Sequence, residues 1–240
     1  MARETRTILL VDNRAASLFY WSMLLKRLEY KVVSKRSAEE ALKALGDSRP
    51  TVVLTDVALP GMDGVALLKV IKDDPRYRDI PVVMLASTDD AATKDACARL
   101  GCTAWFPKDV EPDDLYQKLQ SLIEATPRSH IRLNTSVKVI VGDGTTIGGS
   151  VRTEFASAIS EGGLYVRTRY PQPQNALTPV RILLNGNEVR AKAVVLYSYA
   201  RNEGPYKEPG MGVKFVEISD QDRRLIRQFI KEQLTRDIVH

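Results

Sequence analysis

Three charged residues in the first half of the chain follow apolar segments. Asp12 and Asp56 each end a run rich in branched apolar residues, and Lys108 follows a shorter run with a tryptophan and a phenylalanine. Carboxylate oxygens are the ligands that Mg²⁺ prefers, a lysine ammonium offsets the charge of a phosphate, and a carboxylate can itself be phosphorylated. Two carboxylates and a lysine at one sheet edge would therefore form a site that handles a phosphoryl group.

The elements expected to hold these side chains alternate between strand and helix. Short apolar runs are typical of buried parallel strands, and apolar residues every three or four positions are typical of helices. We expect strands at residues 8–11, 31–33, 51–54, 81–85 and 103–106, and helices at residues 15–28, 38–45, 65–71, 91–100 and 112–125. Gly46 and Gly101 are expected to end the second and fourth helices. The alternation predicts a doubly wound, five-stranded parallel sheet with its active residues at the carboxyl ends of the strands.

Residues 5 to about 124 resemble a response-regulator receiver domain. The resemblance rests on Ile8-Leu9-Leu10-Val11-Asp12, on the turn Pro60-Gly61-Met62-Asp63-Gly64 that follows Asp56, and on Lys108. It implies a flavodoxin-like α/β fold in which Asp56 accepts a phosphoryl group from a sensor histidine kinase. It also implies that Lys108 pairs with that phosphoryl group.

The same resemblance implies a Mg²⁺ site. Its ligands would be Asp12, Asn13, Asp56 and the backbone carbonyl of Ala58. Asn13 stands where the family has a second acidic residue, so the metal would meet less negative charge here.

Two more departures concern the switch that reads phosphorylation. Ala86 ends the fourth expected strand, where the family has a hydroxyl that follows the phosphoryl group, and Ser87 comes one position late. Asp109 stands where the family has a proline after the lysine, so the kink of a cis peptide is not expected there. We expect phosphorylation at Asp56, with a switch of Ala86, Ser87 and Lys108 that differs from the family's.

The second half of the chain has the pattern of a small β structure. Two hairpin signals occur, Ser160-Glu161-Gly162-Gly163 and Asn185-Gly186-Asn187. We expect strands at residues 137–141, 153–159, 164–168, 180–184, 189–196 and 211–216, and one helix at residues 221–234 capped by Ser219 and Asp220. Short strands with one closing helix predict an all-β domain, a small antiparallel barrel with a C-terminal helix.

Two arginines and a glycine turn carry the chemistry of this half. Arg128 and Arg132 are four residues apart, just before the first expected barrel strand. The planar guanidinium group of arginine binds a phosphate or the edge of a guanine through two hydrogen bonds, and it also stacks on flat rings. Ser160 and Gly163 offer a small hydroxyl and a close approach to backbone, which together suit a flat, anionic ligand.

These features resemble a PilZ domain that extends from about Thr126 to the C-terminus. The resemblance implies that Arg128 and Arg132 clamp cyclic di-GMP and that Ser160 and Gly163 hold a base. Ala158 stands where the family has an aspartate or asparagine. The loss of one such hydrogen bond costs on the order of 1–3 kcal/mol, about one to two decades in affinity.

Chain length, composition and charge are consistent with two domains. The chain has 240 residues, of which 44% are hydrophobic, enough for two packed domains. We expect a receiver domain at residues 1–125 and a PilZ domain at residues 126–240. The first holds 18 basic and 19 acidic residues and the second 17 and 11, so the second favours an anionic partner. The two cysteines and two histidines lack the spacing of a metal site or of a nucleophile pair.

The sequence thus predicts a signalling protein that is not an enzyme. No segment has the length and apolarity of a membrane span or of a signal peptide, so we expect a cytoplasmic protein. Its expected partners are a sensor histidine kinase, cyclic di-GMP and a downstream protein that the sequence does not identify. The alternative is a protein-interaction adaptor with degenerate sites, for which Asn13, Ala86 and Ala158 are the evidence. Binding to nucleic acid is the least favoured class, because no helix pair suited to a DNA groove and no aromatic platform suited to RNA is present.

Overall fold

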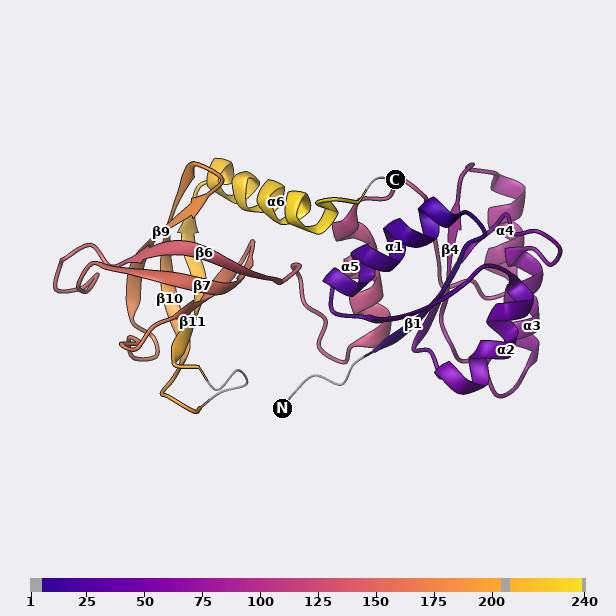
Figure 1. Cartoon of the computed structure of the whole chain (residues 1–240), viewed down its shortest axis with the longest axis horizontal. Coiled ribbons are helices and arrows are strands. Elements are labelled where there is room, and N and C mark those ends of the chain that lie inside the picture. Colours follow the sequence, from indigo (N-terminus) through magenta and orange to yellow (C-terminus); the bar gives the residue numbers. More distant parts are fainter. Residues whose placement is uncertain (1–5, 204–207, 239–240) are drawn as a thin grey trace. The chain divides into compact units, whose positions relative to one another are not determined.

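The structure is a computed structural model that describes residues 6–203 and 208–238 (Figure 1). The chain divides into two compact units, and the division between the receiver-like and barrel parts falls between Ser129 and His130. The domain boundary that we infer from the sequence, between residues 125 and 126, stays a proposal.

The first unit is built on a parallel sheet. Its strands are β1 (Thr7–Val11), β2 (Lys31–Lys35), β3 (Val52–Asp56), β4 (Val82–Ala86) and β5 (Ala104–Pro107). They lie in the order β2-β1-β3-β4-β5, and each neighbouring pair is parallel. The expected doubly wound sheet is confirmed. Its strand order reverses between β1 and β3, which is where sheets of this kind place their ligands.

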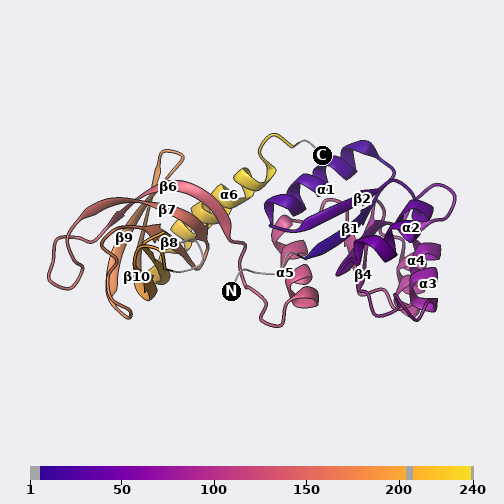
Figure 2. The ribbon, with the colours of Figure 1, turned by 60° about the horizontal axis from the view of Figure 1, so that its bottom comes forward.

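Helices cover both faces of this sheet. They are α1 (Ala15–Arg27), α2 (Ala38–Ser48), α3 (Gly64–Asp73), α4 (Ala91–Arg99) and α5 (Pro112–Ile123). Figures 1 and 2 show α1 and α5 on one face and α2, α3 and α4 on the other. Because strand side chains alternate, Leu9 and Val11 pack toward α2 and α3, while Ile8 and Leu10 point to the face of α1 and α5. Rigid, buried strands therefore fix the backbone just before each expected site residue.

The expectation that Gly46 ends the second helix is wrong. Helix α2 continues through Gly46 to Ser48, and Arg49 caps it in the left-handed region with φ 42°. The backbone N–H of Arg49 donates to the carbonyl of Leu45, so the helix end is satisfied without a glycine. A Cβ at Gly46 would lie 3.4 Å from the hydroxyl of Tyr77, an ordinary contact, so the fold does not require glycine here.

The second unit is a closed antiparallel barrel. Its strands are β6 (Leu133–Val141), β7 (Arg152–Ser160), β8 (Gly163–Arg167), β9 (Leu177–Leu184), β10 (Asn187–Tyr199) and β11 (Gly210–Ile218). They close in the order β10-β11-β8-β7-β6-β9. Buried side chains such as Val139, Ile159, Val166 and Ile182 fill the interior. The predicted barrel is confirmed, and most strands are longer than their apolar runs because polar residues continue the ladders.

Helix α6 (Asp220–Thr235) packs on the barrel through Ile226, Phe229, Ile230 and Leu234. The Ser219 hydroxyl accepts a hydrogen bond from the backbone N–H of Asp222 at 3.0 Å, so the predicted cap is confirmed. Within residues 6–203 and 208–238, none of the helices combines the length and apolarity that a membrane crossing needs.

Candidate functional site

Lys108 joins two carboxylates at the carboxyl edge of the parallel sheet. Its Nζ lies 2.6 Å from Oδ2 of Asp12 and 2.5 Å from Oδ2 of Asp56. The exposed fractions of Asp12, Asp56 and Lys108 are 0%, 2% and 6%. The structure therefore brings together the three charged residues that the sequence singled out, each from a different strand end.

Backbone groups hold the other oxygens of the two carboxylates. Oδ1 of Asp12 accepts from the backbone N–H of Arg14 at 2.9 Å, and Oδ1 of Asp56 accepts from the backbone N–H of Ala58 at 3.1 Å. A Cβ at Gly64 would lie 2.2 Å from the backbone oxygen of Asp56. Only glycine can therefore bring the start of α3 so close to the end of β3, which sets the geometry of the loop that carries Ala58.

The donor set fits a divalent cation. Asp12 and Asp56 carry one more negative charge than Lys108 neutralises. The Arg14 guanidinium, 4.0 Å from Asp12 and 52% exposed, compensates the remaining charge only weakly. Two carboxylates and a nearby backbone carbonyl at Ala58 are hard oxygen ligands of the kind that Mg²⁺ takes. In the described parts of the chain no third carboxylate, histidine or cysteine joins them, since the neighbouring side chain is the exposed amide of Asn13.

The expected switch residues differ in exposure. Ala86 is 4% exposed at the end of β4, whereas Ser87 is exposed. The hydroxyl of Ser87 accepts a hydrogen bond from Nη2 of Arg14 at 3.3 Å. Arg14 also places its Nε 4.0 Å from Oδ1 of Asp12, so its guanidinium lies between the ends of β1 and β4. Arg14 is not among the residues expected from the sequence, where its only signal is its position two residues after Asp12.

Four of the five expected ligand residues of the barrel line one hollow. Arg132, Ala158, Ser160 and Gly163 surround a cavity of about 230 Å³ on the outer side of β7, β8 and β11. The hydroxyl of Ser160 donates to the carbonyl of Gly163 at 3.1 Å and closes the hairpin. A Cβ at Gly163 would lie 2.1 Å from the carbonyl oxygen of Val213, so this position requires glycine. Tyr165, Tyr197 and Lys214, which sequence reasoning missed, line the same hollow.

The fifth residue, Arg128, belongs to the other compact unit. Its backbone N–H donates to Oε1 of Gln120 at 3.2 Å, and Nε2 of Gln120 donates to the hydroxyl of Tyr30 at 2.8 Å. Gln120 is buried, so this chain of hydrogen bonds ties the segment after α5 to the receiver core. Arg128 is not among the residues that line the hollow.

Glu161, inside the glycine turn, is a further functional residue that the sequence did not reveal. It is 5% exposed, and its carboxylate accepts two hydrogen bonds from Arg227 on α6. These hydrogen bonds hold the pKa of Glu161 below its ordinary value, against the effect of burial, and the charges of Arg227, His130 and Arg223 add to the lowering. The turn that carries Ser160 and Gly163 is thereby fastened to the closing helix.

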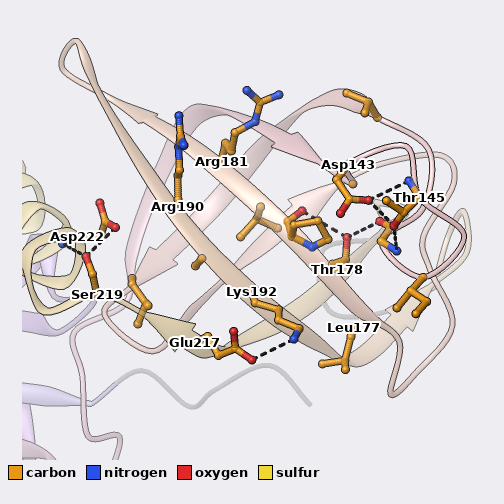
Figure 3. A pocket seen from close by; sticks show the side chains of 18 residues that line it. Asp143, Thr145, Leu177, Thr178, Arg181, Arg190, Lys192, Glu217, Ser219 and Asp222 are labelled. Carbon is orange, nitrogen blue, oxygen red and sulfur yellow. Dashed lines mark hydrogen bonds and ion pairs between the residues drawn. The ribbon is translucent and has the colours of Figure 1, made fainter.

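A larger cavity, of about 1030 Å³, lies on another part of the barrel (Figure 3). It extends from the loop after β6 across β9 and β10 to the start of α6, and it contains none of the expected ligand residues. Its cations already have acidic partners: Lys192 with Glu217 at 3.0 Å, and Arg190 with Glu188 at 2.8 Å. Figure 3 shows Arg181 and Arg190 pointing outward, away from the floor at Thr178. This cavity has no arrangement of groups that predicts a particular chemistry.

Cys97 is buried and Cys102 is half-buried. Burial raises the pKa of both thiols, that of Cys97 to about 11. A thiol is a nucleophile only as its thiolate, and burial disfavours that form at both residues. Both are free thiols.

Comparison with known proteins identifies the family of the first unit. Residues 8–120 match the model of the response regulator receiver domain. The two-component response regulator ORR5 of Oryza sativa is 32% identical over 110 residues, which cover 45% of this chain and 81% of that protein. This chain belongs to the two-component response-regulator family.

Residues 124–232 of this response regulator match the model of the PilZ domain. The receiver domain is thus followed by a PilZ domain, as the residues themselves indicated. The phosphate regulon transcriptional regulatory protein PhoB of Pseudomonas aeruginosa is 26% identical over 121 residues, 50% of this chain and 53% of PhoB. The response regulator therefore spans about half the length of that relative. The solved structure of the chemotaxis protein CheY4 of Vibrio cholerae is 26% identical, with a TM-score of 0.47 over 50% of this chain and 99% of that one.

Proposed function

We propose that this response regulator receives two signals, a phosphoryl group on Asp56 and cyclic di-GMP on the outer face of its barrel. The ammonium of Lys108, bonded to both Asp12 and Asp56 at a buried sheet edge, is the observation that supports the first. The hollow formed by Arg132, Ala158, Ser160 and Gly163 supports the second. The protein acts by regulation rather than catalysis, and its output is contact with a downstream protein.

Phosphorylation uses Asp56 as the nucleophile. A carboxylate oxygen of Asp56 attacks the phosphorus of a phosphohistidine on the sensor kinase, the phosphorus–nitrogen bond breaks, and its electron pair stays on the imidazole. Lys108 offsets the negative charge of the transferred group, and its hydrogen bond to Asp12 keeps the ammonium in place. Mg²⁺, held by Asp12, Asp56 and the carbonyl of Ala58, would neutralise further phosphate charge, with the amide of Asn13 at the edge of the site.

Ligand binding uses the arginine forks and the hairpin. Arg132 lies at the hollow that Ser160 and Gly163 line, so its guanidinium can bind a phosphate or a guanine edge in pairs of hydrogen bonds. Arg128, four residues earlier, would supply the second guanidinium group for the ligand.

The experiment for this function has two arms. A small phosphodonor with Mg²⁺ should add one phosphoryl group to the chain, as measured by intact mass, and calorimetry should show saturable binding of cyclic di-GMP. If neither occurs, the two-signal function is wrong. The adaptor alternative, favoured by the methyl group of Ala158 at the place of a hydrogen-bonding side chain, predicts that the chain binds a protein partner regardless of both small molecules.

A further inference from the structure

A row of side chains crosses four strands on the outer face of the barrel. Ala158 on β7 pairs with Tyr165 on β8, Tyr165 pairs with Gly212 on β11, and Gly212 pairs with Tyr197 on β10. Directly paired residues point to the same side of a sheet. Gly212 lies on the same side of β11 as the exposed Lys214, so the row from Ala158 to Tyr197 faces outward.

A β-bulge turns Tyr197 toward the hollow. Val195 pairs with Val213 and Tyr197 pairs with Gly212, which leaves Leu196 as the extra residue of β10. A bulge of this kind re-aims the side chains around it, and here Leu196 and Tyr197 are 44% and 36% exposed. Both residues line the hollow with Arg132 and Ser160.

Glycine on β11 makes room for the ring of Tyr197. A Cβ at Gly212 would lie 2.2 Å from Cζ of Tyr197, so the ring occupies the space of the missing side chain. The ring is nearly parallel to that of Tyr165, with centroids 6.4 Å apart and an angle of 29° between the planes. The ring of Tyr199 also lies against Tyr197, with centroids 5.3 Å apart. Tyr165 is only 6% exposed, whereas 36% of Tyr197 stays exposed and can meet a ligand.

Ala158 carries no carboxylate, so the part of the hollow around it is more apolar than an aspartate at this position would make it. Ala158, Tyr165, Gly212 and Tyr197 form a surface without a charged group, and Arg132, Ser160 and Lys214 line the same hollow. Its volume of about 230 Å³ is below the roughly 300–1,000 Å³ of pockets that enclose a whole drug-sized ligand. It suits one flat base, with the rest of the ligand on the surface.

We propose that Tyr197 holds a purine base of the ligand by stacking, and that this contact replaces the hydrogen bond lost at Ala158. This inference rests on the proposed binding of a cyclic dinucleotide. Stacking depends little on which base is stacked, whereas an acceptor at position 158 would favour a guanine through its N–H donors. The site therefore takes cyclic dipurine nucleotides with weak discrimination, cyclic di-AMP as well as cyclic di-GMP.

Competition against a fluorescent cyclic di-GMP, with full-length chains, tests both parts of the proposal. Tyr197→Phe keeps the stacking ring and should bind within about twofold of wild type, whereas Tyr197→Ala should weaken both dinucleotides by about ten- to a hundredfold. Tyr170→Ala removes a tyrosine that is 64% exposed and outside the hollow, and it should change neither affinity.

Base selectivity supplies the readout that a purely structural role of Tyr197 would not change. Wild type should prefer cyclic di-GMP over cyclic di-AMP by less than about tenfold, and Ala158→Asn should widen that preference by about a decade. The selectivity comparison of wild type with Ala158→Asn involves no change at Tyr197. It therefore remains a valid test even if Tyr197→Ala does not fold.

The outcomes separate this inference from the proposed function. If wild type binds cyclic di-GMP and Tyr197→Ala binds it equally well, or if wild type already excludes cyclic di-AMP by a thousandfold, the stacking proposal is wrong and the proposed function stands. If wild type binds neither dinucleotide, the proposed ligand function is wrong, and the stacking proposal falls with it.

Discussion

The carboxylate of Glu161 accepts hydrogen bonds from both Nε and Nη2 of Arg227, each 2.8 Å long. Arg223, one helical turn earlier, donates from Nη1 to the backbone carbonyl of Glu161 at 2.9 Å. Two arginines of α6 thus hold the turn between β7 and β8. Ser160 and Gly163 flank that turn, so the placement of the ligand hairpin depends on the closing helix.

This ion pair predicts a pH dependence of stability. The pKa of Glu161 in the folded chain is below its ordinary value of 4.5, so the carboxylate stabilises the fold above pH 4.5. That stabilisation is lost as the pH falls through the lowered pKa. Because the Arg227 side chain is 56% exposed, solvent screens the pair, and we expect an effect on the order of 1 kcal/mol.

Urea unfolding at pH 7 and at pH 3 measures this effect. Glu161→Gln should lower the free energy of unfolding at pH 7 and should lose less stability than wild type between the two pH values. Glu217→Gln breaks the pair with Lys192, in which both side chains are well exposed, and it should have little effect at either pH. Equal pH dependence of wild type and Glu161→Gln would show that the pair does not stabilise the fold.

Asp56 should be the phosphorylation site of the receiver. A small phosphodonor with millimolar Mg²⁺ should add one phosphoryl group to wild type, and Asp56→Asn should add none because the amide is not a nucleophile. Asp95→Asn, an exposed change on α4, is the matched control and should behave as wild type. Intact-mass spectrometry reads the result, and phosphorylation of Asp56→Asn would place the acceptor elsewhere.

Asn13→Asp should raise the affinity for Mg²⁺. An additional carboxylate beside Asp12 and Asp56 restores a hard anionic ligand, and a gain of about one decade is expected. Titration of Mg²⁺ against the fluorescence of Trp21, buried on α1, or by calorimetry measures the change. Unchanged affinity would show that the exposed side chain of residue 13 does not reach the metal.

Ala158→Asn should strengthen cyclic di-GMP binding by about one decade, since the amide restores one hydrogen bond to a guanine. Asn is preferred to Asp because it adds no negative charge near the phosphates. Ser160→Ala should weaken binding, since it also removes the hydroxyl that closes the hairpin on Gly163. If Ala158→Asn does not bind more tightly and Ser160→Ala does not bind more weakly, this hairpin does not bind a base. The adaptor hypothesis is then the better one.

The receiver fold and its charged residues could be predicted because local pattern determines them. Strand and helix periods alternate without interruption, and Asp12, Asp56 and Lys108 each stand at a strand end that the parallel sheet brings to one edge. The predicted helix end at Gly46 is wrong because a single glycine is tolerated inside a helix. Here Arg49 caps the C-terminus of α2 instead.

The remainder of the site depends on contacts between distant segments. Glu161 and Arg227 are separated by 66 positions, and nothing near either residue indicates the other. The extra residue Leu196 and the space at Gly212 place Tyr197 at the hollow, and a bulge has no reliable signal in a single sequence. Arg14 likewise becomes informative only when Ser87 is seen beside it.

The most direct test of this account is isothermal titration calorimetry of the full-length chain with cyclic di-GMP, on wild type, Arg128→Lys and Arg132→Lys. Lysine keeps the charge but loses the planar fork, so each variant should bind at least about tenfold more weakly than wild type. Arg152→Lys, at an exposed arginine outside the hollow, should bind as wild type does. We predict saturable binding by wild type and weaker binding by both Arg128→Lys and Arg132→Lys. No heat of binding in wild type, or full binding by both lysine variants, would contradict the claim that these arginines form a cyclic di-GMP site.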